Sequence, residues 1–339
     1  KANAYGHGIA GVSKILIKNG ADWLCVASIE EAEVLRKSGV RKPVLIMGYV
    51  KRNYLSRAIQ LRARMFIFDQ KTVNLLSKKA KKLRTTALVH LKVDTGMSRQ
   101  GINPRLLQNF IADARKLPNL KIEGVATHFA NSDEPHHSFF QSQLSAFRAL
   151  KYLIENQKTE YLFHAANSAA TLLAPNSHFD LVRPGLALYG LYPSAETRKI
   201  CLKKGLTLRP AMSFKTRVTQ IKSIGAGSFV GYGLTHRVNK PAKIAILPVG
   251  YYDGLDRKLS NRGQVLIRNQ RAPIVGRVCM DLIIVDITKI RGVKIEDEAV
   301  IIGRQGTEEI TVEEIAKRAG TINYEIIARL RENLPRVYA

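Results

Sequence analysis

The sequence of 339 residues contains few cysteines, no long apolar run and no internal repeat. Its three cysteines, Cys25, Cys201 and Cys279, are odd in number and widely spaced, so they fit reduced thiols in a cytoplasm better than a disulfide framework. No apolar run approaches the length of a membrane span, and no secretory signal stands at the start. No spacing of ligands suggests a metal. We therefore expect no membrane anchor and no metal site.

Acidic residues are also scarce. There are 27 of them against 54 lysines and arginines, which gives a net charge of +27. Such a charge attracts nucleic acid and anionic surfaces, so a nucleic-acid binder is a genuine rival class. However, the basic residues are scattered in small groups, without a zinc finger, an RNP motif or an aromatic-interleaved stripe. We expect no specific nucleic-acid partner, and a basic host proteome or anionic small ligands would explain the charge equally well.

The first part of the chain alternates apolar runs with amphipathic stretches, which predicts βαβ units and a parallel sheet. Seven runs predict strands: 21–27, 43–47, 65–69, 87–93, 122–127, 162–166 and 181–183. Helices are predicted over 28–38, 70–83, 104–117 and 141–156. The chain lacks an initiator methionine, and we expect a strand before Lys1 to be missing from it. An eighth strand would close a TIM-type (β/α)₈ barrel, whereas seven would also suit an open doubly wound sheet.

After about residue 205 the pattern changes to apolar runs separated by glycine and charged turns, which predicts a second, mostly β domain. The predicted strands are 215–221, 243–249, 264–267, 282–286 and 299–302. One helix is expected there, because Thr311-Val-Glu-Glu314 is a capping box that opens a helix to about Arg318. We therefore divide the chain into a barrel domain, 1–204, and a β domain, 205–339.

The most informative segment is the octapeptide 1–8, Lys-Ala-Asn-Ala-Tyr-Gly-His-Gly. Gly6 and Gly8 allow a tight turn and a close approach of the backbone to a ligand. Lysine forms Schiff bases with carbonyl cofactors such as pyridoxal phosphate (PLP). A lysine near a chain start is ordinarily a solvated charge, so the octapeptide needs support from the rest of the sequence.

That support comes from polar residues at the ends of several predicted strands, where a barrel enzyme carries its chemistry. A polar residue at a strand end is more often a cap or a turn residue. Here five strand ends carry polar residues, which favours a single site to which all five contribute. The residues are Lys1, Lys92 with Asp94, His128, Asn167 with Ser168, and Arg183.

The octapeptide and these later motifs, in the same order, closely resemble the bacterial alanine racemases over essentially the whole chain. The resemblance implies that Lys1 attaches PLP and acts as one catalytic base, with Tyr232 as the opposing base. It implies that Arg183 hydrogen-bonds the pyridine nitrogen and that His128 links this arginine toward the tyrosine. The phosphate would be held by Tyr5, Ser168, Tyr324 and the main chain of Gly185 and Leu186.

The resemblance also implies a substrate site and supporting residues. Arg99 and the main chain of Met280 would bind the substrate carboxylate, with Asp281 in a supporting position. Lys92 matches a lysine that is carbamylated in many members and helps to orient the arginine, although it could equally be an unmodified lysine. Tyr251 matches a gate residue at the entrance. A head-to-tail homodimer is implied, in which Tyr232 and Met280 reach the partner's active site.

Two bases with ordinary pKa values of about 10.4 (lysine) and about 10 (tyrosine) would work poorly near neutrality. A cationic neighbourhood, or desolvation of the lysine, would lower these values. An arginine at the pyridine nitrogen would leave that nitrogen unprotonated, because arginine does not give up its proton, and this favours racemisation over transamination. The implied activity is the interconversion of L- and D-alanine in a bacterial cytoplasm, supplying peptidoglycan.

Some alternatives remain open. Within enzymes, these are a serine or broad-specificity racemase and a related decarboxylase, although Met280-Asp281 differs from the Cys-Asp pairing typical of the decarboxylases. Outside enzymes, a non-catalytic PLP carrier would ordinarily lack the second domain. Departures from the usual family pattern at Ser98, Pro184 and Tyr252 put substrate breadth in doubt rather than reaction class.

Overall fold

The computed structural model describes residues 1–155 and 160–338. The chain forms two compact units. The first unit consists of Lys1–Ala2 and Ile9–Pro210, and the second consists of Asn3–Gly8 and the chain from Ala211 onward. The second unit is therefore discontinuous in sequence, because a short piece of the octapeptide belongs to it.

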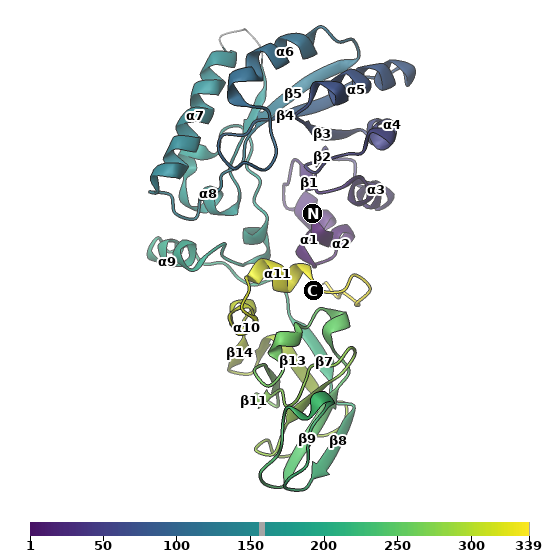
Figure 1. The fold of residues 1–339 in the computed structure, drawn as a ribbon, viewed down its shortest axis with the longest axis vertical. Helices are drawn as coiled ribbons and strands as arrows, with labels where there is room; N and C mark the ends of the chain where they lie inside the picture. Colours follow the sequence, from purple (N-terminus) through teal and green to yellow (C-terminus); the bar gives the residue numbers. More distant parts are fainter. Residues whose placement is uncertain (156–159, 339) are drawn as a thin grey trace. The chain divides into compact units, whose positions relative to one another are not determined.

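The first unit is built on a parallel half-barrel sheet of six strands in the order β1-β2-β3-β4-β5-β6 (Figure 1). The sequence predicted each of these strands, with bounds that differ by a few residues. The strands are β1 Leu24–Val26, β2 Val44–Ile46, β3 Ala63–Ile67, β4 Ala87–Lys92, β5 Leu120–Ala126 and β6 Leu162–His164. Neighbours in sequence are neighbours in the sheet, so the carboxyl ends of all six strands lie at one edge.

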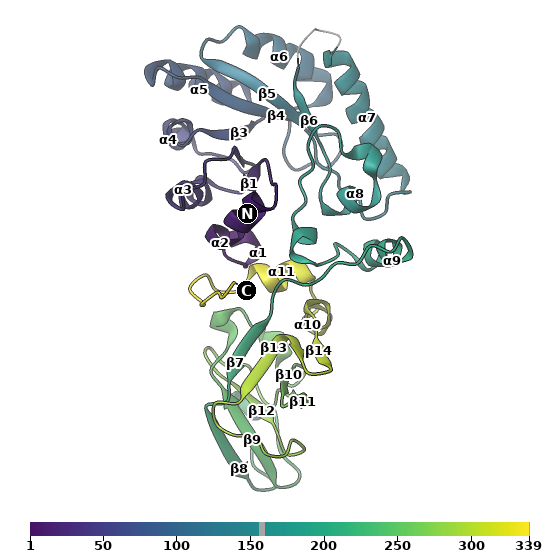
Figure 2. The same cartoon turned by 180° about the vertical axis from the view of Figure 1, so that it is seen from behind.

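The helices between the strands return the chain to the start of the next strand, and α3 to α6 pack on one side of the sheet (Figures 1 and 2). Each predicted helix forms; the last residue of the prediction 141–156, Asn156, lies outside the described residues. The elements are α2 Ile9–Lys18, α3 Ile29–Lys37, η1 Arg52–Tyr54, α4 Leu55–Gln60, α5 Gln70–Lys82, η2 Pro104–Leu106, α6 Leu107–Arg115, α7 Ser138–Glu155, α8 Ser168–Leu173, η3 Pro175–Ser177, η4 Leu186–Tyr189 and α9 Ala195–Lys203.

Local sequence explains where several of these helices begin. Ser28, Asp69 and Asn167 each accept a hydrogen bond from a main-chain N–H in the first turn of α3, α5 and α8, respectively. Such N-caps satisfy donors that a helix leaves unpaired. Asn167 follows the end of β6 by three residues and caps the helix that begins at Ser168. It thereby fixes the position of Ser168 at the carboxyl edge of the sheet.

The seventh predicted strand, 181–183, is wrong as a strand. Leu181 makes only one parallel bridge with His164. The Asp180 N–H donates to the Phe163 carbonyl and the Arg183 N–H to the Ala166 carbonyl, a spacing of three residues instead of the two that a ladder needs. Pro184 follows and has no N–H to continue the pairing. The segment therefore runs beside the end of β6 as irregular chain and carries Arg183 there.

The second unit is mostly antiparallel β structure (Figure 2). One sheet has the order β11-β10-β13-β14, with β7 also paired to β13, and a three-stranded sheet has the order β12-β9-β8. The prediction 215–221 splits into two strands, and β11, β14 and α11 were not predicted. The elements are β7 Phe214–Arg217, β8 Gln220–Ile224, η5 Tyr232–Leu234, β9 Ala242–Leu247, η6 Tyr251–Asp253, η7 Arg257–Leu259, β10 Gln264–Ile267, β11 Gln270–Pro273, β12 Ile283–Asp286, β13 Glu298–Gln305, β14 Glu308–Ile310, α10 Val312–Ala319 and α11 Asn323–Ala328.

The octapeptide forms an unusual turn. Residues Ala2–Tyr5, labelled α1, have φ values between 50° and 55°, so this is a single turn of left-handed helix made by non-glycine residues. A Cβ at Gly6 would collide with the Ile327 carbonyl, and one at Gly8 with the Tyr338 hydroxyl. The two glycines were expected to allow a close approach to a ligand; in the structure they allow a close approach to the second unit's own chain.

Candidate active site

Five basic side chains gather in the first unit: Lys1, Lys92, Arg99, His128 and Arg183. Lys92 is the last residue of β4, and His128 follows the end of β5 by two residues. Burial, and then the charges of Arg183, Lys92, Arg99 and Lys1, lower the pKa of His128 to about 2. His128 is therefore a neutral imidazole, and the cluster of cations around it favours an anionic ligand.

Lys92 is the most perturbed lysine of the cluster. Its side chain is 6% exposed, and burial followed by the charge of Arg183 lowers its pKa to about 6. Asp94 opposes this effect without reversing it. At neutral pH the Lys92 amine is consequently uncharged, which makes it a nucleophile.

Arg183 is held by several acceptors. Its Nη1 donates to His164 Nδ1 over 2.5 Å. Its Nη2 donates to the Thr127 carbonyl at 2.8 Å, to the Ala165 carbonyl at 3.1 Å and to His128 Nδ1 at 3.4 Å. Burial lowers the pKa of Arg183 to about 10, so the guanidinium keeps its charge at neutral pH.

Lys1 lies beside the end of β1, where its main-chain nitrogen donates to the Cys25 carbonyl at 3.5 Å. Desolvation, and then the charge of Arg99, lower the pKa of the Lys1 side-chain amine, while Glu31 raises it. The lowered pKa increases the fraction of neutral amine, which is the form that reacts with carbonyl groups and accepts protons.

The loop that carries Arg99 is organised by Asp94. Asp94 Oδ1 accepts hydrogen bonds from the main-chain N–H groups of Gly96 and Ser98, at 2.9 Å and 3.1 Å. Ser98 has φ 56°, a left-handed conformation that glycine adopts without a Cβ penalty. Ser98, a departure from the usual family pattern, therefore adopts a conformation that favours glycine.

Ser168, Gly185 and Leu186, which the resemblance assigned to a phosphate site, lie together in the first unit. Ser168 Oγ accepts hydrogen bonds from the Gly185 N–H at 2.8 Å and from the Ala187 N–H at 3.2 Å. Leu186 is buried between these two donors. The start of α8 is thereby joined to the start of η4, where main-chain N–H groups and a hydroxyl group could meet a phosphate.

The remaining predicted residues belong to the second unit. Tyr5 and Tyr324 are neighbours there, with ring centroids 6.2 Å apart. Tyr232 is 74% exposed, Met280 54% and Tyr251 42%. Asp281, which follows Met280, is also exposed.

Three loops of the second unit bring these exposed residues close to one another. The Tyr251 N–H donates to the Cys279 carbonyl and the Tyr252 N–H to the Met280 carbonyl, both at 3.0 Å. Gly233, next to Tyr232, lies against the Arg277 guanidinium. The unit thus exposes two functional candidates, Tyr232 and Met280, on neighbouring loops.

Sequence reasoning missed three residues that are linked to Arg183 one after another by hydrogen bonds. His90 and His164 are fully buried, and Glu123 is 19% exposed and lies beside His90. The available signal was a histidine within each of two mainly apolar predicted strands, 87–93 and 162–166. Nothing in the pattern of 122–127 pointed to Glu123.

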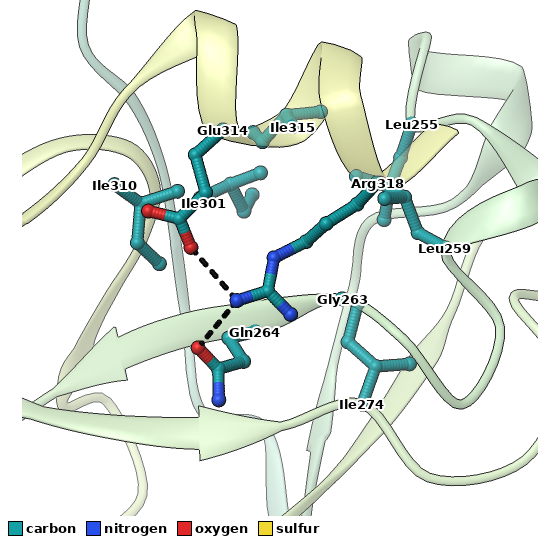
Figure 3. Close-up of a pocket in the computed structure, with 10 residues that line it drawn as sticks. All are labelled: Leu255, Leu259, Gly263, Gln264, Ile274, Ile301, Ile310, Glu314, Ile315 and Arg318. Carbon is teal, nitrogen blue, oxygen red and sulfur yellow. Dashed lines mark hydrogen bonds and ion pairs between the residues drawn. The ribbon is translucent and has the colours of Figure 1, made fainter. Parts of the chain in front are cut away.

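A small cavity in the second unit is not part of this group of residues (Figure 3). Arg318 Nη2 donates to Glu314 Oε1 at 3.0 Å and to Gln264 Oε1 at 3.1 Å across it (Figure 3). The remaining walls are mainly leucine and isoleucine side chains. Because its charged groups satisfy one another, the cavity resembles ordinary packing between α10 and the sheet.

Two further features are absent from the described residues. No helix among them is long and apolar enough to cross a membrane. No group of three or more histidine, cysteine and acidic side chains in the described chain is arranged to hold a metal ion.

Comparison with known protein families supplies the decisive observation. Residues 1–193 match the model of the alanine racemase N-terminal domain, and residues 211–338 match that of the C-terminal domain. The chain belongs to the alanine racemase family. Its activity class is therefore that of an isomerase, an amino-acid racemase that interconverts L- and D-alanine.

Individual relatives are similar to this chain along essentially its full length. The alanine racemase of Methanococcus maripaludis is 41% identical over 340 residues, covering 100% of this chain and 90% of the relative. That of Syntrophobacter fumaroxidans is 44% identical over 333 residues, covering 98% and 88%.

Solved structures give the same result for the fold. The alanine racemase of Clostridium difficile 630 has a TM-score of 0.94 at 35% identity, covering 100% of this chain and 87% of that one. The Bacillus anthracis alanine racemase, solved with bound L-Ala-P, has a TM-score of 0.93 at 36% identity, covering 100% and 86%. The predicted fold class, a TIM-type barrel followed by a mostly β domain, is confirmed by these likenesses.

Proposed function

We propose that this alanine racemase works with PLP bound at the basic cluster and uses Lys1 and Tyr232 as its two bases. The observation that carries the proposal is the cluster itself, in which the guanidinium groups of Arg99 and Arg183 lie near Lys1 and the neutral side chains of Lys92 and His128. A site of this charge suits an anionic cofactor and an amino-acid carboxylate.

The residues present fit PLP. Lys1 offers an amine with a lowered pKa for attachment. Ser168 with the main chain of Gly185 and Leu186 offers a phosphate site, and Tyr5 and Tyr324 are the further phosphate candidates. The hydrogen bonds of Arg183 within the described chain use Nη1 and Nη2 and leave Nε for the pyridine nitrogen.

When bound, PLP supplies the electron sink that makes the α-proton of alanine acidic. Racemisation removes this proton from one face and returns a proton to the other, which calls for two bases on opposite faces. We assign Tyr232 to the L-alanine side and Lys1 to the D-alanine side. Arg183 keeps its proton at neutral pH, since its pKa is about 10, and a donor that retains its proton favours racemisation over transamination.

On the substrate side, Arg99 binds the carboxylate together with the main chain of Met280. Asp281 supports this segment, and Tyr251 controls access at the entrance to the active site. Lys92, which is neutral at pH 7, takes up carbon dioxide as a carbamate. The positive charges of Arg183 and Arg99 stabilise the negative charge of this carbamate.

We also propose a homodimer in which Tyr232 and Met280 serve the partner's active site. The support is their exposure: two functional side chains, 74% and 54% exposed, stand on adjoining loops beside the exposed Leu234 and Leu282. Exposed apolar groups that gather in this way mark interaction surfaces.

The barrel domain, 1–204, would carry the cofactor and the β domain, 205–339, the partner-directed residues. The expected role is D-alanine supply for peptidoglycan in a bacterial cytoplasm. A reducing compartment agrees with Cys25, Cys201 and Cys279, which are all free thiols.

Purified protein tests the proposal directly. Its absorption spectrum should contain the PLP band and respond to L-alanine, and chiral analysis should then find D-alanine. Borohydride reduction should fix the cofactor on the peptide that contains Lys1. Label on another lysine, or release of carbon dioxide instead of D-alanine, would contradict the assignment.

A further inference from the structure

A line of hydrogen bonds runs through the buried interior of the first unit and ends at Arg183. Arg183 Nη1 contacts His164 Nδ1 at 2.5 Å, and His164 Nε2 contacts His90 Nδ1 at 2.8 Å. His90 Nε2 then contacts Glu123 Oε2 at 3.4 Å. The side chains come from three adjacent strands, β4, β5 and β6, and the segment that follows them.

The direction of every bond in this line is determined by its first member. Arginine is only a donor, so His164 Nδ1 must accept and the proton of that ring must be on Nε2. His164 therefore donates to His90 Nδ1, which places the His90 proton on Nε2, facing Glu123. Both rings are neutral, because a second proton on either would set two donors against each other.

Glu123 is the acceptor that terminates the line. It is also held by Arg64, whose Nε and Nη2 donate to its two oxygens at 2.8 Å and 3.1 Å. Burial by itself would raise the pKa of Glu123, but the hydrogen bonds from His90 and Arg64 outweigh it and lower that pKa to about 2. Glu123 is thus a permanent carboxylate at neutral pH.

The sheet is locally modified to bring Glu123 to His90. The register between β4 and β5 shifts, because Val89 pairs with Ile122 while the next residue, His90, pairs with Gly124. Glu123 is the extra residue of a β-bulge, a feature that redirects a side chain. Bulges are rare in parallel sheets, so this one indicates a constraint on residue 123.

We propose that Glu123, acting through His90 and His164, is a positioning residue that fixes the hydrogen-bond direction at Arg183 and thereby the orientation of its guanidinium. The inference deepens the proposed function, since it concerns the arginine assigned to the cofactor. Without a carboxylate acceptor, the His90 proton can move to Nδ1. His164 must then reverse, and its Nδ1–H faces the Nη1 donor of Arg183.

Two substitutions of Glu123 test this. Glu123→Leu removes the acceptor, whereas Glu123→Gln keeps a carbonyl oxygen in the same place and should rescue the direction of the line. In ¹⁵N-histidine-labelled holoenzyme, NMR should find His90 and His164 protonated on Nε2 in the wild type and in Glu123→Gln. In Glu123→Leu these signatures should be lost, and the Kd for PLP should rise about tenfold, roughly the effect of one hydrogen bond.

Glu33→Leu is the matched control, because Glu33 accepts from Arg57 Nε at 2.7 Å in the same unit but lies outside the line. It should lose stability without changing either the tautomers or the Kd for PLP. Should Glu123→Leu not fold, His164→Asn and His164→Leu make the same comparison, since an asparagine oxygen can accept at the Nδ1 position. His164→Asn should then retain PLP at least several-fold more tightly than His164→Leu.

The outcomes separate the two proposals. Wild-type tautomers and wild-type PLP affinity in folded Glu123→Leu, or equal affinities of the two His164 variants, would overturn the positioning role. Altered tautomers with unchanged PLP affinity would also overturn it, because the line would then not act on Arg183. A wild-type protein that neither binds PLP nor racemises alanine refutes the proposed function instead, and the tautomer measurement remains readable in that protein.

Discussion

Gly124 leaves the space that the His90 ring fills: a Cβ on residue 124 would lie 2.5 Å from His90 Nδ1 and 2.7 Å from the Leu162 carbonyl. The backbone of β5 can therefore pass the ring only at a glycine. The requirement is one of close approach, since Gly124 does not have a positive φ.

Gly124→Ala should consequently destabilise the protein by about 1–3 kcal/mol, the usual effect of overpacking a core. It should also weaken PLP retention, because His90 must move away from His164. Thermal unfolding and cofactor titration measure the two effects. Gly225→Ala is the control, since a Cβ on residue 225 would enter open space and its φ is ordinary, and it should be neutral or slightly stabilising. Equal melting temperatures for the two variants would refute the packing argument.

Tyr232→Phe should reduce the L-to-D reaction by about 10²–10⁴-fold, which is the contribution of a positioned general base. Attachment of PLP to Lys1 should survive, since the substitution removes only a hydroxyl group. Steady-state rates in both directions, with the absorption spectrum, provide the measurement. Tyr152→Phe serves as control because Tyr152 is similarly exposed, at 68%, on α7. Racemisation at the wild-type rate in both directions would contradict the two-base assignment.

Mixing two inactive variants tests whether the sites are shared between subunits. Lys1→Ala and Tyr232→Ala should each be inactive alone. In a mixed dimer with shared sites, one site combines both defects and the other is intact. Random pairing makes about half of the dimers mixed, so co-expression should recover about a quarter of wild-type activity. If mass spectrometry detects mixed dimers that remain inactive, Tyr232 serves its own chain.

Carbamate on Lys92 should depend on pH in a defined direction. The pKa of the Lys92 amine is lowered to about 6, so the amine is neutral above that pH and protonated below it. Only the neutral form takes up carbon dioxide. With ¹³C-bicarbonate, a carbamate signal should therefore be present at pH 8 and disappear as the pH falls below about 6. Lys92→Met should lack the signal at every pH, and its persistence there would assign the carbamate to another amine.

The sequence predicted all six strands of the half-barrel because buried parallel strands are short apolar runs that stand out between amphipathic helices. It missed β11, Gln-Arg-Ala-Pro, and β14, Glu-Glu-Ile, because half-exposed antiparallel strands of this length have no distinctive pattern. Seven apolar runs also overcounted the strands by one, since the local pattern of 181–183 does not reveal the irregular spacing of its hydrogen bonds.

The candidate residues were predicted mainly from resemblance, and the structure adds their physical surroundings. The low pKa of Lys92 depends on Arg183, which is distant in sequence, and no local pattern could reveal it. Glu123 is a stronger example. It looks like an ordinary surface glutamate in the run 122–127, and only a shift of register between two strands turns it toward His90.

The discontinuous second unit limits how the protein can be dissected. Arg336 Nε donates to the Gly6 carbonyl at 2.9 Å, and the Tyr338 hydroxyl donates to the His7 carbonyl at 3.0 Å, both within that unit. A fragment that starts at Ala211 would leave these donors without their acceptors and uncover the surface of α11 that Gly6 contacts. An autonomous β module therefore needs the peptide Asn3–Gly8 restored, by a fused linker or in trans, and a recombinant that joins two homologues at residue 211 takes this part of its second unit from the parent that supplies the first unit.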